Sequence, residues 1–180
     1  MAALLRRIGK SHLIRNAVFL GTAYCVTESF QQTVIGEEYD IAKIERFGIW
    51  GLCFNGPAMY GWYKLLDGFL PGTAARAVTM KMCLDQVIMT PVCIVGFYIV
   101  MSAMEGKSDL FAEVKRKAIP TYLASVAFWV PAQFINFRLV PPIFRVVYVG
   151  STSFIWANIL CIFKRQGEPV LSSAEANHPE

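Results

Sequence analysis

The chain has 180 residues, of which 55% are hydrophobic and only 17% are charged, and its formal net charge at pH 7 is +4. Soluble domains carry about 25% charged residues, so this composition, with a mean hydropathy of +0.44, excludes an ordinary water-soluble domain. We therefore expect an all-α fold, a polytopic membrane bundle of four to five kinked transmembrane helices whose first partner is the lipid bilayer.

The N-terminal segment is basic and free of acids. Arg6, Arg7, Lys10 and Arg15 all precede the first acidic residue, Glu28. Such a start is typical of a mitochondrial targeting region and also of a basic anchor on anionic lipid. We predict a targeting or anchor segment over residues 1–12, a single transmembrane domain over 13–165 and a disordered polar tail over 166–180.

Four stretches of the chain carry no charge and have the length of a membrane-spanning helix. About 20 helical residues cross a hydrocarbon core of about 30 Å, because each residue adds 1.5 Å. A fifth stretch, residues 17–35, is similar but contains Glu28 and two glutamines. We predict five spans, with four spans and an interfacial first segment as the alternative. The uncharged stretches are Phe47–Tyr63, Gln86–Met104, Ala118–Phe137 and Val146–Phe163.

The first predicted helix is amphipathic. Gly21, Cys25 and Ser29 step by four residues and form a ridge of small side chains that allows another helix to approach closely. Glu28 and Gln32 lie on the same face. We expect this face to point into the bundle, where Glu28 has three candidate basic partners, namely Arg46, Arg138 and Arg145.

Prolines inside the apolar stretches predict kinks, because each proline removes one hydrogen bond from the helix. The Gly56-Pro57 pair is expected to bend the second helix near its middle. Pro91 lies inside the third helix and Pro131 inside the fourth, and Pro141 marks the exit into the fifth.

A charged segment, Ser108–Ala118, separates the third and fourth spans. Its apolar residues Leu110, Phe111 and Val114 fall on one face of a helix, and Glu113 and Lys117 lie off that face. This pattern predicts a short helix on the membrane surface.

Polar side chains inside apolar helices are the candidate functional groups. A charge at the bilayer centre costs about 2.5–3.5 kcal/mol, so such groups pair inside the bundle or line a watery cavity. Asp85 also has a structural explanation, because Lys81 lies one helical turn before it. Gln133 and Asn136 of the fourth helix also have a structural explanation, because their side-chain amides can donate hydrogen bonds to the backbone carbonyl groups freed by the kink at Pro131. The set comprises Glu28, Asp85, Gln86, Gln133, Asn136, Arg138 and Arg145.

The sequence lacks the patterns of common catalytic and binding sites. Its histidines, His12 and His178, lie outside the apolar spans, so none is available within a membrane as a base or metal ligand. Phosphate-binding glycine loops are absent, and the basic residues are too scattered for a nucleic-acid face. We expect no enzymatic activity, no cofactor and no direct nucleic-acid partner.

Three segments together resemble the Mpv-seventeen and peroxisomal-membrane-protein-twenty-two family, and most closely its Mpv-seventeen-like subgroup. They read RFGIWGLCFNGPAMYGWYKLLDGFLP, KMCLDQVIMTP and FWVPAQFINFRLVPPIFRVVYVGSTSFIWA, and the likeness spans about residues 14–165. Tyr60 stands where the family often has histidine, and Val130 splits its Trp-Pro pair. The motif positions carried over are Gly56, Pro57, Trp62, Tyr63, Asp67, Asp85, Gln86, Pro91, Pro131, Gln133, Asn136, Phe137, Pro141 and Arg145.

The resemblance implies a small helical protein of the mitochondrial inner membrane or, alternatively, the peroxisomal membrane. Its members are associated with channel-like permeability, reactive-oxygen metabolism and mitochondrial DNA maintenance. The first hypothesis is a weakly selective channel for small solutes, linked to reactive-oxygen and mitochondrial homeostasis. The first, third and fourth helices would line it, with Arg138 and Arg145 at one mouth.

The second hypothesis is a non-catalytic accessory or assembly subunit. It would dock on a larger inner-membrane complex through the small-residue ridge of the first helix and the glycines of the second. A homo-oligomer is the alternative association, and migration as a small homo-oligomer would count against the accessory role.

Overall fold

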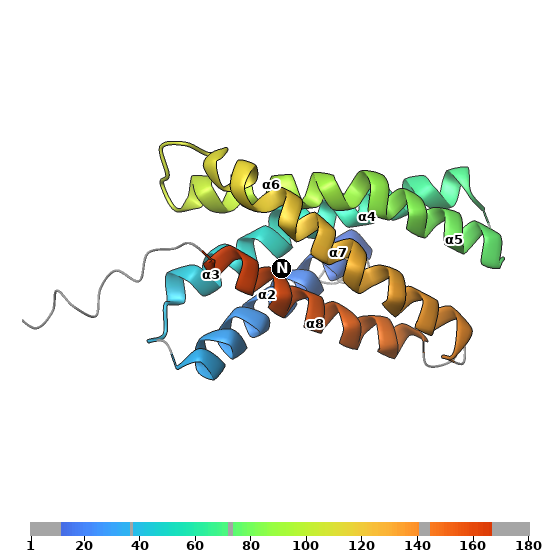
Figure 1. The fold of residues 1–180 in the computed structure, drawn as a ribbon, viewed down its shortest axis with the longest axis horizontal. Coiled ribbons are helices and arrows are strands. Elements are labelled where there is room, and N and C mark those ends of the chain that lie inside the picture. The colour runs from blue at the N-terminus through green and yellow to red at the C-terminus, as the bar shows by residue number, and fades with distance from the viewer. Residues whose placement is uncertain (1–11, 37, 72–73, 141–144, 167–180) are drawn as a thin grey trace, which may run out of the picture.

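The structure is a computed structural model that describes residues 12–36, 38–71, 74–140 and 145–166. Within these ranges every regular element is helical (Figure 1), which confirms the all-α prediction. The basic segment before His12, the tail after Gln166 and the proline at position 141 lie outside the described residues.

The described residues form five long helices, two of which contain an internal π-helical turn. The uncharged stretches all fall within these helices, which continue beyond them into polar sequence. Two of the described helices, over Arg76–Met104 and Ala112–Ile135, are long and apolar enough to cross a membrane. The helices are α2 (His12–Ile35), α3–η1–α4 (Ile41–Ile49, Trp50–Asn55, Gly56–Phe69), α5–η2–α6 (Ala75–Leu84, Asp85–Met89, Thr90–Met104), α7 (Ala112–Arg138) and α8 (Arg145–Arg165).

The long helices form a closed ring. Helix α2 packs against α3, η1 and α4 on one side and against α8 on the other. Helix α6 contacts α3 and η1, α7 contacts α6, and α8 completes the ring by contacting α7. Successive helices run in opposite directions (Figure 1). The loops 36–40 and 105–111 and the end of α8 therefore share one end of the bundle, which we call the loop-105 end.

Small residues determine how closely α2 approaches the helix formed by residues 41–69. A Cβ atom on Gly51 would lie 2.7 Å from the carbonyl oxygen of Leu20, and one on Gly56 would lie 2.5 Å from Ala17 Cα. Gly48 packs against Cys25 in the same way. The close approach predicted for the α2 ridge is confirmed. These glycines pack within the chain, so they are not the external docking face that the accessory-subunit hypothesis required.

Each proline at the centre of the second and third long helices follows a π-helical turn. Pro57 comes directly after η1, where Gly56 N–H donates to Gly51 C=O, five residues back. Pro91 follows η2, where Thr90 N–H donates to Asp85 C=O across the same interval. A π turn accommodates the ladder bond that a proline cannot make. Helix α7 continues through Pro120 and Pro131, and the bend predicted at Pro131 stays a prediction.

The predicted surface helix over 108–118 is wrong. Ser108 and Asp109 lie in the loop, and Ala112 begins α7, which runs without interruption to Arg138. The orientation also differs from the prediction, because Glu113 and Lys117 are buried whereas Phe111 is half exposed. Other charged side chains supply partners for Glu113 and Lys117, which the amphipathic pattern alone could not indicate.

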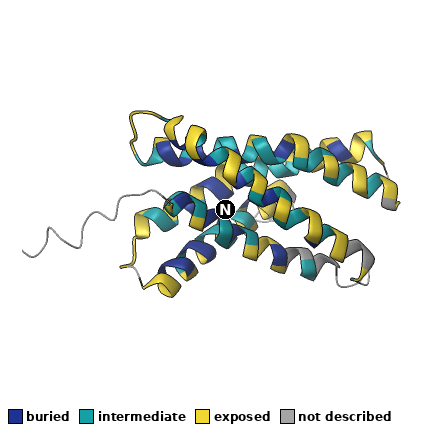
Figure 2. Ribbon diagram, viewed as in Figure 1, coloured by how far each residue is buried: buried dark blue, intermediate teal, exposed yellow. Residues whose placement is uncertain are grey.

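An aromatic core lies between the middle of the bundle and the loop-105 end. Phe47, Trp50, Phe97 and Tyr98 are buried, and Phe97 makes edge-to-face contacts with each of the other three at 5.3–5.6 Å. Exposed positions follow the outward faces of the long helices (Figure 2). They include large apolar side chains such as Phe134, which is 68% exposed.

Candidate functional site

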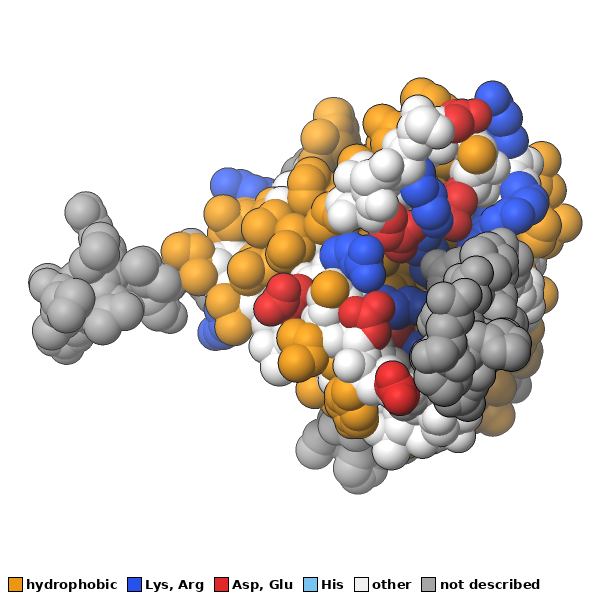
Figure 3. Space-filling view, turned by 90° about the vertical axis from the view of Figure 1, so that its left-hand side faces the viewer, with side chains coloured by type: hydrophobic (Ala, Val, Ile, Leu, Met, Phe, Trp, Pro, Cys, Tyr) orange, Lys and Arg blue, Asp and Glu red, His pale blue; other side chains and the backbone are white. Residues whose placement is uncertain are grey.

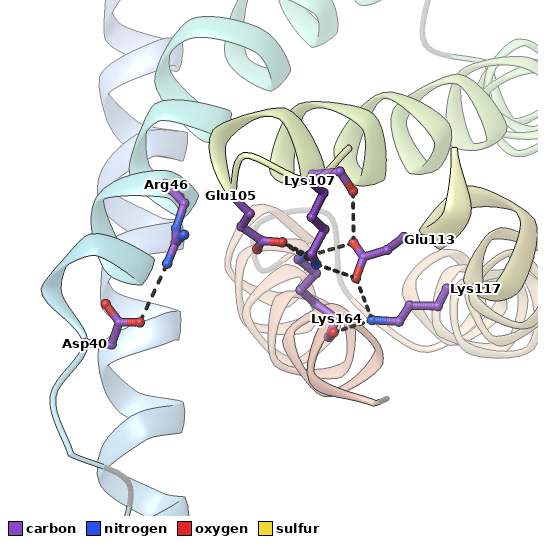
Figure 4. Close-up of polar contacts among 8 residues, drawn as sticks. Asp40, Arg46, Glu105, Lys107, Glu113, Lys117 and Lys164 are labelled. Carbon is purple, nitrogen blue, oxygen red and sulfur yellow. Dashed lines mark hydrogen bonds and ion pairs between the residues drawn. The ribbon is translucent and has the colours of Figure 1, made fainter. Parts of the chain in front are cut away.

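Charged side chains gather at the loop-105 end of the bundle. Figure 3 shows basic and acidic side chains side by side on this end, with hydrophobic side chains around them. The group among them that is joined by ion pairs around Glu113, which we call the charge layer, is drawn in Figure 4. It consists of Glu105, Lys107, Glu113, Lys117 and Lys164.

Glu113 is the centre of the charge layer. Its Oε2 atom accepts from Lys164 Nζ at 2.6 Å and from Ser102 Oγ at 3.3 Å. Its Oε1 atom accepts from Lys107 and Lys117, each at 3.1 Å. Lys164, whose side chain is fully buried, also donates to Glu105 at 2.8 Å. The layer therefore joins the end of α6, the start of α7 and the end of α8.

The pKa values in the loop reflect these contacts. Burial alone would raise the pKa of Glu105, but the hydrogen bonds and charges of Lys107 and Lys164 outweigh burial and hold it below its usual value. Burial would lower the pKa of Lys107, and Glu105 and Glu113 reverse this and raise it. Both groups are therefore held in their charged forms at neutral pH.

Glu28 forms a second buried ion pair near this end. Its Oε1 atom accepts from Arg165 Nη2 at 2.6 Å and from Gln32 Nε2 at 3.1 Å. Arg165 was not among the three partners predicted from the sequence, so that prediction is corrected, and Arg46 instead contacts Asp40 at 3.6 Å. The helix ends of α2 and α8 meet here, a long-range contact that no local spacing reveals.

A cavity of about 670 Å³ occupies the centre of the ring. All five long helices line it. From the sequence, only the first, third and fourth helices were predicted to line a channel, so α8 and the 41–69 helix are additions. Three of the predicted polar residues, Asp85, Gln86 and Gln133, are brought together there. Glu28 is not among the lining residues.

Asp85 is held by a tryptophan. Its Oδ1 atom accepts from Trp62 Nε1 at 3.0 Å, across the gap between η2 and α4. Lys81, the partner suggested by helical spacing, makes a 2.6 Å ion pair with Asp67 nearer the helix ends. The bond between Trp62 and Asp85 therefore joins two of the segments that carry the family resemblance.

Three polar atoms on residues of the cavity wall are buried without a hydrogen-bond partner among the described residues. They are Gln86 Oε1, next to Asp85 in sequence, Ser125 Oγ on α7 and Trp50 Nε1 in η1. Such atoms carry a desolvation cost unless a ligand or water satisfies them. The side chains of Asn136, Arg138 and Arg145 lie outside the described part of the structure.

Metal chemistry has no support in the described residues, where no three His, Cys, Asp or Glu side chains are grouped as ligands. The charge layer and the role of Arg165 were not predicted from the sequence. Glu113 and Lys117 had a detectable signal, because they are spaced i,i+4 as ion pairs in helices often are. Lys164 and Arg165 had none, since a basic pair at the end of an apolar helix is also typical of a membrane interface.

A helical ring around a mostly apolar cavity with a few polar groups defines the class of fold, and comparisons with known proteins define the family. A model of the Mpv17 / PMP22 family matches residues 102–161. The "Mpv17-like protein" of Bos taurus is 31% identical over 172 residues, which cover 96% of this chain and 88% of that protein. The chain therefore belongs to the Mpv17 / PMP22 family.

Other relatives carry the names of the two membranes considered from the sequence. The human "Mitochondrial inner membrane protein Mpv17" is 35% identical over 113 residues, covering 61% of this chain and 64% of that protein. "Peroxisomal membrane protein 2" of Bos taurus is 27% identical over 122 residues, covering 67% and 62%. No solved structure matches the chain.

Proposed function

We propose that this protein is a polytopic protein of the mitochondrial inner membrane that passes small solutes through the centre of its helical ring. The observation that carries the proposal is the central cavity, lined by all five long helices and containing Asp85, Gln86 and Gln133. The apolar outward faces provide the lipid contact that such a protein needs. The names of the relatives support this membrane, with the peroxisomal membrane as the alternative.

The layers around the cavity suggest how passage would be controlled. Trp50 and Phe97 belong both to the cavity wall and to the aromatic core, and Leu160, which is buried in the same hydrophobic cluster, also lines the cavity. Beyond them, Tyr98 bonds Thr121 at 2.7 Å and lies 5.9 Å from the Lys117 ammonium group. A continuous path therefore requires the aromatic core and the charge layer to separate, so the structure corresponds to a closed state of the proposed channel.

Conductance of the purified protein in a planar bilayer tests the proposal. Asp85→Asn removes the one carboxylate among the described residues of the cavity wall and should reduce selectivity for cations over anions. Asp109→Asn is the matched control, because Asp109 carries the same group on an exposed position of the 105–111 loop, outside the cavity. Absence of discrete openings, or equal effects of the two substitutions, would contradict the proposal.

The accessory-subunit hypothesis remains the second proposal, and the exposed apolar side chains of α7 and α8 fit a protein partner as well as lipid. Co-migration with a large complex in mild detergent, together with silence in the bilayer, would favour it.

A further inference from the structure

The central cavity has the composition of a binding site rather than of a simple water-filled pore. Its volume of about 670 Å³ falls within the range of small-molecule sites, about 300–1,000 Å³. Most of its wall is apolar, with a few polar groups among which Asp85 is the one charged side chain of the described residues. Sites of this kind hold one organic molecule and orient it through the polar groups.

The charged groups of the wall determine whether a cation or an anion is favoured as the ligand. Asp85 is a carboxylate, and none of the described residues that line the cavity is a lysine, an arginine or a histidine. Trp62 donates a hydrogen bond to Asp85 but carries no charge, so the carboxylate is not neutralised by this contact. A cation in the cavity would complete the missing half of an ion pair, whereas an anion would meet an unpaired like charge.

The aromatic rings of the wall also favour a positively charged ligand. Each long helix contributes at least one ring, among them Tyr24, Tyr60, Phe97, Trp129 and Trp156. Aromatic faces attract cations through their quadrupole, and they also cover the apolar body of an organic ligand. An inorganic cation would gain little from such a wall, because it would lose its hydration and find few oxygen ligands.

Three unsatisfied atoms at the wall point to a ligand independently of the charge. They are Gln86 Oε1, Ser125 Oγ and Trp50 Nε1, each buried without a partner among the described residues. Gln86 Oε1 can only accept a hydrogen bond, so a cationic donor such as an ammonium group would satisfy it. Trp50 Nε1 can only donate, so it needs an acceptor atom on the ligand or a water molecule.

We propose that the cavity is a saturable binding site for an organic cation with an aromatic or alicyclic body, anchored by Asp85. The inference rests on the proposed function, since it names the class of solute that the same cavity would accept. Asp85 supplies the charge, Gln86 the second acceptor and the aromatic rings the walls.

Two probes of nearly equal size and opposite charge test the proposal, tetraphenylphosphonium and tetraphenylborate. The readout is the intrinsic fluorescence of the full chain in detergent. Trp50, Trp129 and Trp156 line the cavity, and Trp62, the fourth tryptophan of the chain, bonds Asp85. We expect saturable quenching by the phosphonium cation and at least about tenfold weaker binding of it to Asp85→Asn, the usual size of a lost charge-assisted contact.

The matched variant Asp109→Asn separates site binding from partition into the micelle. Its phosphonium affinity should equal that of the parent, because Asp109 is an exposed loop residue that does not line the cavity. Equal saturable binding of both probes, or an Asp85→Asn variant that binds the cation as the parent does, would overturn the inference.

Conductance distinguishes this failure from failure of the channel proposal. Openings whose selectivity depends on Asp85, without saturable binding of the cation, would retain the channel and reject the binding site. Saturable, Asp85-dependent binding without openings would retain the site and reject the channel.

Discussion

The charge layer and the central cavity are both polar regions inside an apolar bundle, but their polar groups are satisfied differently. In the charge layer, Glu113 alone accepts from three lysines and a serine. In the cavity, Asp85 has one hydrogen-bond donor among the described residues, Trp62, and Gln86 Oε1 has none. A fully connected network stabilises a fold and fixes how helices meet, whereas unsatisfied groups around empty volume are suited to a ligand.

The largest effect is expected from breaking the charge layer at its centre. Glu113→Gln leaves three lysines facing a single carboxylate, and the unfolding free energy should fall by about 3 kcal/mol, as when one partner of a buried ion pair is lost. Thermal unfolding in detergent measures it. Glu45→Gln is the control, because the same change at an exposed position of α3 should cost within about 0.5 kcal/mol.

This prediction also sharpens the comparison between the two regions. The folded fraction of Glu113→Gln should bind tetraphenylphosphonium as the parent does, because Glu113 does not line the cavity. A loss of binding in the folded fraction would show that the two regions are not independent.

A smaller effect is expected at the ion pair between α2 and α8. Glu28→Gln keeps one acceptor oxygen but removes the charge that Arg165 contacts at 2.6 Å. The cost should be about 2 kcal/mol, the size of a charge-assisted hydrogen bond. Arg165→Gln and the double variant complete a double-mutant cycle, and a coupling energy near zero would mean that the pair contributes no net stability.

The pH dependence of stability should follow the charge layer. The pKa of Glu105 is lowered in the folded state, so its contribution is complete above the unfolded value of about 4.3 and is lost as the pH falls through the folded value. The pKa of Lys107 is raised, so its contribution is complete below about 10.4 and is lost as the pH rises through the folded value.

Unfolding measured across this range should therefore show a plateau near neutrality. Glu105→Gln should flatten the acid side, and Lys107→Gln the alkaline side. An unchanged acid side in Glu105→Gln would indicate that other carboxylates control the acid transition.

The predictions from sequence succeeded where a local pattern reports a local property. The period of small residues in α2 predicted the face that packs, because helix geometry alone places Gly21 and Cys25 together. Uncharged stretches located the long helices, although not their ends. The family motifs also identified Asp85, Gln86 and Gln133, which the fold collects at one cavity.

The failures share a different physical cause. Arg165, the ion-pair partner of Glu28, lies 137 residues away along the chain. Lys164, one of the three lysines that contact Glu113, lies 51 residues away. Only the packing of α8 brings these two basic side chains near. An acidic and basic segment such as 108–118 is equally compatible with solvent and with a buried network when its partners are unknown. Assigning the charged face to solvent was therefore the wrong choice for Glu113 and Lys117.

The smallest effect is expected at Trp62. Trp62→Phe removes the 3.0 Å bond to Asp85 but keeps an aromatic ring at this position. The unfolding free energy should fall by only about 1 kcal/mol, because the carboxylate borders the cavity and water can replace the lost donor. The charge of Asp85 stays in place, so tetraphenylphosphonium should bind at least as tightly as to the parent. A cost as large as that of Glu113→Gln would mean that the cavity wall is as dry as the charge layer, and the contrast between the two regions would fail.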